Sequence, residues 1–263
     1  MAAEEVLAQT AGGAAEHAET GIHVALSAER FGEFLGVPIT NTLIMSWIVV
    51  ALLVVLAIVV GGRLKITPGR FQTLLEWVVG GIYDYVADTL GGREMARKFF
   101  PLLMTIFLFI FVGNMLHFLP GFGSIGFYVD GEFVPLLRSV NTDLNVTLAL
   151  AAISFIVIET TGVVVLGLKK YAGKFFNFHS FIGFIVGIID LFSEMARLIS
   201  FSFRLFGNIL AGEILILVAI HFIPYGGPVP LMMFEVFVGF IQAAIFAILT
   251  LFFIKIAIME PSH

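Results

Sequence analysis

Cysteine is absent from this chain of 263 residues, and charged residues are scarce, at 13% of the total. The absence of cysteine excludes disulfides, thiolate metal sites and cysteine nucleophiles, and it leaves the redox compartment undecided. A soluble domain usually has about 25% charged residues. Here 59% of the residues are hydrophobic, so there is too little polar surface to cover a water-soluble body. The composition therefore indicates an integral membrane protein.

Several functional motifs are also missing from the sequence. There is no phosphate-binding loop of the form G-x-x-x-x-G-K-S/T, so we expect neither a nucleotide site nor a cofactor on this chain. Basic residues form no stripe outside the loops between apolar runs, which excludes nucleic-acid binding. No internal repeat is evident, which argues against a secondary transporter. The six histidines lie in tails or near the ends of apolar runs, which argues against a haem-carrying subunit.

The apolar runs that are present predict an all-α membrane protein with about five membrane-crossing helices. A polar lead at 1–40 is expected to be partly disordered or surface-lying, and 41–260 are expected to form a single transmembrane domain. The segment at about 71–90 mixes apolar with acidic residues, so it predicts an amphipathic helix at the membrane interface. The crossing helices are expected at about 41–61, 98–119, 143–168, 180–221 and 230–259.

The run from 181 to 221 contains no proline and is unusually long. As one helix it would measure about 60 Å, roughly twice the hydrocarbon thickness of a membrane. It therefore predicts either two spans or one strongly tilted helix. If the run crosses once, all the basic loops fall on one side, which places the N-terminus outside and the C-terminus in the cytoplasm. We favour one long tilted helix, followed by a last helix that is also long and tilted.

Ionisable side chains within the last two apolar runs are costly in a membrane, so they are interpreted as functional. At about 100° per residue, one face of the 181–221 helix collects a polar set, and Glu213 points away from Arg204. On the last helix, Glu235 and Gln242 share a face. The short turn between the helices brings this face near Glu213 and Asn208. The polar set on the 181–221 helix consists of Asp190, Glu194, Arg197, Arg204 and Asn208.

Structural roles compete with functional ones at several of these positions. Arg197 pairs with Glu194 or extends to the inner interface, and Asp190 and Glu194 are either functional or merely interfacial. Glu159, inside another apolar run, is either protonated and packed or lies on an aqueous cavity. Arg204 stays charged in any protein environment, and no acidic residue on its own helix has the spacing to neutralise it. We therefore expect its partner to come from elsewhere.

The residues around Arg204 form a recognisable motif. The segment SFSFRLFGN at 200–208, followed by Ala211, Gly212 and Glu213, resembles the signature of the ATP synthase subunit a family. The segment DLNVTLAL at 143–150 is similar to a second block of that family, and the spacing to Gln242 fits as well. The resemblance covers about residues 40–260.

This resemblance implies a static subunit a of a rotary F-type ATP synthase in a bacterial inner membrane. Such a subunit packs against a rotating ring of c subunits, each with one membrane carboxylate, and has peripheral-stalk b subunits and the lipid bilayer as further partners. Two offset half-channels pass protons to and from the ring, and Arg204 would be the essential charge between them. By the same resemblance, the outer route would include Asn208, Glu213, Glu235, Gln242, Asp143 and Asn145, and the inner route Asp190, Ser193 and Glu194.

One departure from the family pattern concerns Glu213 and Glu235. Some relatives have histidine in place of one of these carboxylates, whereas both are glutamate here. Two nearby carboxyls do not readily ionise together, so our hypothesis is that this pair titrates as a unit.

Overall fold

The computed structural model describes residues 30–34, 37–118, 126–129, 132–135, 138–175, 181–224 and 226–259. Most of the polar lead, 1–29, lies outside these residues, so its expected disorder is not addressed by them. Within the described ranges the chain forms seven α-helices: α2 (Asn41–Gly62), α3 (Arg70–Leu90), α4 (Arg93–His117), α5 (Leu144–Leu166), α6 (Leu168–Phe175), α7 (Phe181–Phe222) and α8 (Pro228–Ile258).

Five of these helices are long and apolar enough to cross a membrane: α2, α4, α5, α7 and α8. The predicted all-α fold with about five spans is therefore confirmed. Helix α7 is a single unbroken helix of 42 residues, and α8 has 31 residues, so the two long final helices are confirmed as well. Helix α3 is not among the candidate spans, in keeping with its polar content.

Short elements were not expected from the sequence. Strands β1 (Arg30–Phe34) and β2 (Val37–Thr40) form one antiparallel hairpin, and β3 (Gly126–Val129) and β4 (Glu132–Pro135) form another. A single 3₁₀ turn, η2 (Val140–Thr142), precedes α5. Helix α6 follows α5 after Gly167, whose backbone φ of +82° suits glycine and ends α5.

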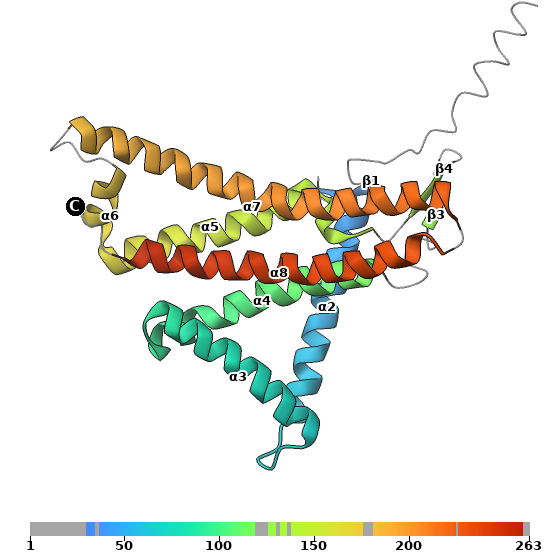
Figure 1. Ribbon diagram of the computed structural model, residues 1–263, viewed down its shortest axis with the longest axis horizontal. Helices are drawn as coiled ribbons and strands as arrows, with labels where there is room; N and C mark the ends of the chain where they lie inside the picture. Colours follow the sequence, from blue (N-terminus) through green and yellow to red (C-terminus); the bar gives the residue numbers. More distant parts are fainter. Residues whose placement is uncertain are drawn as a thin grey trace, which may run out of the picture.

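Helices α4, α5, α7 and α8 form the main bundle and lie lengthwise beside one another (Figure 1). Helices α2 and α3 project away from this bundle. The bundle has two distinct ends. At one end, called the hairpin end, α7 turns into α8. At the other, called the α6 end, α6 lies beside the ends of α5 and α7.

The bundle core contains Ile106 and Ile110 of α4, Phe201 and Leu205 of α7, and Phe246 of α8. Leu205 is fully buried, so the side of α7 that carries Leu205 faces the bundle. Arg204, the preceding residue, consequently projects from the bundle, because neighbouring helical residues lie about 100° apart.

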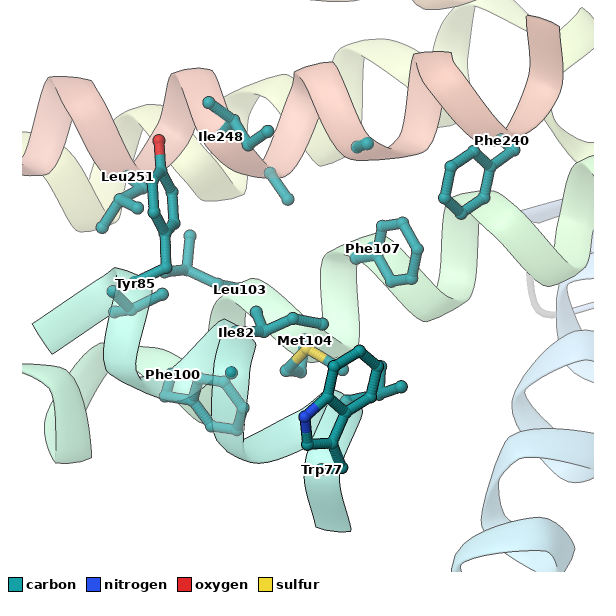
Figure 2. Close-up of a pocket in the computed structure, with 15 residues that line it drawn as sticks. Trp77, Ile82, Tyr85, Phe100, Leu103, Met104, Phe107, Phe240, Ile248 and Leu251 are labelled. Atoms are coloured by element: carbon teal, nitrogen blue, oxygen red, sulfur yellow. The ribbon is translucent and has the colours of Figure 1, made fainter. Parts of the chain in front are cut away.

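A separate apolar cavity of about 520 Å³ lies between α3, α4 and α8. Figure 2 shows its lining, which includes Trp77 of α3, Phe100 and Phe107 of α4, and Phe240 of α8. The lining is aromatic and aliphatic and contains no carboxyl, amine or imidazole group. The side chains that line this cavity therefore offer no group suited to carry protons.

Candidate functional site

Arg204 lies near the middle of α7 with its side chain exposed on the surface of the chain. Its Nη2 donates a long hydrogen bond of 3.4 Å to the hydroxyl of Ser200, one turn earlier. The ion pairs of the described residues involve Arg93, Lys98 and Arg138, and none of them involves Arg204. Within the described part of the chain, this guanidinium thus has no carboxylate partner.

Asn208 and Gln242 connect α7 to α8 one turn beyond Arg204. The Nδ2 group of Asn208 donates to Oε1 of Gln242 over 2.7 Å, and Gln242 is buried. The structure thus brings together two residues that are 34 positions apart, as the antiparallel arrangement of the two long helices predicts.

Glu213 and Glu235 lie closer to the hairpin end. Glu235 of α8 is buried, and its carboxyl group lies where a Cβ atom on Gly212 would be. A side chain at 212 would therefore displace this carboxyl. Glu213, which is half-buried, forms an ion pair of 3.8 Å with the buried Arg138. Glu235 thus lies against Gly212, the residue before Glu213, and Glu213 has a counter-charge in Arg138, which was not singled out from the sequence.

Asp143 and Asn145 lie at the start of α5. Asp143 caps this helix, because its Oδ1 accepts hydrogen bonds from the backbone N–H of Asn145 at 2.8 Å and from its side-chain amide at 3.0 Å. Its Oδ2 accepts from the hydroxyl of Thr42 on α2 at 2.8 Å. Both carboxylate oxygens of Asp143 therefore stabilise the junction of α2 and α5.

A chain of buried amides adjoins this junction. The side chain of Asn141 donates to Oδ1 of Asn114 at 2.6 Å, and Asn114 donates to the backbone carbonyl of Gly239 at 3.1 Å. Both asparagines are almost completely buried. The bonds link η2, α4 and α8, and neither asparagine had been singled out from the sequence.

Asp190, Ser193 and Glu194 lie on the other side of Arg204, toward the α6 end. Glu194 is buried, Asp190 is half-buried, and Ser193 is exposed and donates to the backbone carbonyl of Ile189 at 2.8 Å. The Arg197 guanidinium lies 3.9 Å from the centre of the Phe253 ring, a cation–π contact that neither interpretation of Arg197 anticipated.

The expected common face of α7 is only partly present. Glu194 is buried against the bundle, whereas Arg204 and Asn208 are exposed. Placing residues at about 100° intervals around the helix axis assumes that the same side of the helix is buried along its whole length. Helix α7 instead packs against α5, α6 and α8, so the buried side changes along the helix.

The two polar groups are separated along the bundle by Arg204. Glu194 precedes Arg204 by ten residues and Glu213 follows it by nine, which correspond to about 15 Å and about 14 Å along the helix axis. Polar residues thus approach Arg204 from opposite ends of the bundle. Among the described residues, no three His, Asp or Glu side chains are placed to hold a metal ion.

Comparison with known proteins connects this geometry to a family. The family described as ATP synthase A chain matches residues 43–255. The chain belongs to this family. The family indicated by the motif around Arg204 is therefore confirmed.

Curated members of the ATP synthase A chain family are similar to the chain over most of its length. An ATP synthase subunit a from Geotalea daltonii is 33% identical over 224 residues, which cover 83% of this chain and 87% of the relative. One from Desulfotalea psychrophila is 34% identical over 223 residues, covering 83% of this chain and 84% of the relative. The chain is a multi-pass membrane protein, and its bacterial relatives indicate the plasma membrane.

Proposed function

We propose that this chain is the static, proton-conducting subunit a of an F-type ATP synthase, and that Arg204 separates two proton half-channels. Membership of the ATP synthase A chain family supports the overall function, which is the one expected from the sequence. The chain works within the ATP synthase complex, so other subunits of that complex are its partners. A ring of c subunits and the peripheral-stalk b subunits are the partners in contact with its membrane helices.

The exposed, carboxylate-free Arg204 is the observation on which this proposal depends. A permanent charge without a partner inside a membrane costs several kcal/mol. A membrane carboxylate on another subunit would remove this cost and would itself be stabilised in its ionised form. Exposed apolar residues on the same helix, among them Ile199 and Phe203, provide a surface against which such a subunit can pack.

The outer route leads to Arg204 from the hairpin end. Glu235 and Glu213 take up protons, and the hydrogen-bonded pair of Asn208 and Gln242 stands at the last step before the ring. Asp143 and Asn145 border this route, and Asp143 fixes α2 to α5 through its bond with Thr42. A proton delivered here neutralises the ring carboxylate, which can then face lipid.

The inner route leads away from Arg204 toward the α6 end. After rotation, the ring carboxyl releases its proton toward Glu194, Asp190 and Ser193. Arg204 favours the ionised carboxylate and prevents a proton from passing directly between the two routes. A potential of 100 mV supplies about 2.3 kcal/mol per charge, so several protons must be combined for each ATP. In this orientation the N-terminus is outside and the C-terminus is cytoplasmic.

The variant Arg204→Ala tests this function in the complete complex reconstituted in vesicles. We expect assembly to survive and both ATP synthesis and ATP-driven proton pumping to be lost. Arg204→Lys should fail as well, because a compact ammonium does not reproduce the planar guanidinium. Ser200→Ala is the matched control, since it removes the hydrogen-bond partner of Arg204 and leaves the charge. Normal pumping by Arg204→Ala would refute the proposed function.

A further inference from the structure

Glu159 of α5 has a specific partner on α6. The hydroxyl of Tyr171 donates a hydrogen bond of 2.5 Å to Oε2 of Glu159. A Cβ atom on Gly162 would collide with the Tyr171 ring, so the ring lies directly on the α5 backbone one turn from Glu159. Glycine at 162 and tyrosine at 171 therefore form a close-fitting contact that holds the phenol against the carboxyl.

Helix α6 covers this contact. Its buried side carries Tyr171 and Phe175, whose rings meet edge to face with centroids 5.6 Å apart. Lys169 and Lys170 are exposed on the same short helix. This distribution is that of an amphipathic cover with its polar side toward water.

The groups around Tyr171 can accept one proton without becoming charged overall. Burial and the hydrogen bond to Glu159 raise the pKa of Tyr171, and the charge of Glu194 raises this pKa further. The phenol therefore keeps its proton and serves as a permanent donor. The charge of Arg197 on α7 acts in the opposite direction and lowers this pKa, but it is the smallest of these effects. Together, Glu159, Glu194 and Arg197 carry a net charge of −1, which a single proton neutralises.

The position of this cluster follows from the pairing of α5 with α7. Thr147 of α5 and Ser202 of α7 share a hydrogen bond of 3.2 Å, and the two helices run in opposite directions. Glu159 lies twelve residues after Thr147, about 18 Å along α5. It is therefore on the same side of Arg204 as Asp190 and Glu194, toward the α6 end.

We propose that Glu159 is a further proton-carrying residue of the inner route, positioned by Tyr171, and that it connects Glu194 with the water beyond α6. This inference rests on the proposed function. A proton leaves the Glu194 carboxyl and binds the Glu159 carboxylate, so that Glu194 becomes ionised as Glu159 becomes neutral. Glu159 then releases the proton to water and is ionised again.

Glu159→Gln in the complete complex tests this role, because an amide still accepts the Tyr171 hydrogen bond but cannot bind a transferable proton. We expect ATP-driven proton pumping to fall about tenfold. Passive proton conduction, measured after the soluble ATP-hydrolysing subunits are removed, should fall by the same factor. This is less than the 10²-fold typical of a sole proton-transfer group, since Asp190 and Glu194 remain. Assembly and the unfolding midpoint in detergent should not change. Glu159→Asp should conduct, and Tyr171→Phe, which keeps the ring on Gly162, should show a smaller loss than Glu159→Gln.

Thr160→Val is the matched control, because its exposed hydroxyl bonds only to the backbone of its own helix. Wild-type conduction by Glu159→Gln, or an equal loss in Thr160→Val, would overturn the inference. A Glu159→Asp variant as impaired as Glu159→Gln would also overturn it. If Arg204→Ala abolishes coupling while Glu159→Gln conducts normally, only this inference fails, whereas normal pumping by Arg204→Ala removes the proposed function itself.

Discussion

The ion pair between Arg138 and Glu213 provides a sharp test of the outer route. Arg138→Leu removes the guanidinium and leaves the Glu213 carboxylate without its counter-charge. The two groups are 3.8 Å apart, Arg138 is 7% exposed and the Glu213 side chain is 20% exposed. Water therefore reaches the carboxylate only in part and cannot replace the lost interaction fully.

The size of the effect follows from this geometry. Removing one partner of a fully buried pair costs about 3–5 kcal/mol. Because Glu213 is partly exposed and the pair is long, we expect a loss of about 2–3 kcal/mol of stability. Proton passage through Glu213 should fall as well, because its carboxylate loses the guanidinium that faces it.

The assay is ATP-driven proton pumping in vesicles, with assembly measured in parallel. The double variant Arg138→Leu with Glu213→Gln completes a cycle. If the pair acts as a unit, the double variant should pump no worse than Glu213→Gln alone. Additive losses in the double variant, or unimpaired pumping by Arg138→Leu, would refute the reasoning.

Two further predictions concern the packing around this route. Gly212→Ala places a methyl group where the Glu235 carboxyl lies, so this carboxyl must move and proton pumping should fall, with little loss of stability because the end of the Glu235 side chain is flexible. Gly80→Ala, where a Cβ meets nothing within 4 Å, is the control, and equal pumping by the two variants would contradict the prediction. Asn141→Ala leaves the buried Oδ1 of Asn114 without its donor and should destabilise the chain by about 1–3 kcal/mol, seen as a lower unfolding midpoint in detergent. An unchanged midpoint would show that this amide chain is dispensable.

The long helices could be predicted because their causes are local. The run at 181–221 contains no proline, and neither glycine nor proline occurs from 197 to 204, where two spans would need a turn, so one helix was the simpler interpretation. Helix α6 was missed because it has only eight residues, and its lysines resembled a loop that ends a span. The helical character of α6 depends on Tyr171 and Phe175 packing against other elements, which the sequence pattern alone does not reveal.

The candidate site was predictable where it follows from helix geometry and less so where it depends on distant contacts. Asn208 and Gln242 meet as the antiparallel helices require. Arg138 precedes Glu213 by 75 residues and belongs to a loop, so no periodicity connects the two. Glu159 left two interpretations open, and only the position of Tyr171 identifies its hydrogen-bond partner.

The distance between the Arg204 guanidinium and the membrane carboxylate of the neighbouring ring subunit is the most direct test of the central claim. A structure of the assembled membrane sector would provide it. Our account predicts that Arg204 faces this carboxylate across the subunit boundary, with no acidic side chain of its own chain closer to it. An Arg204 paired with a carboxylate of its own chain, or one surrounded by bulk water, would contradict the account.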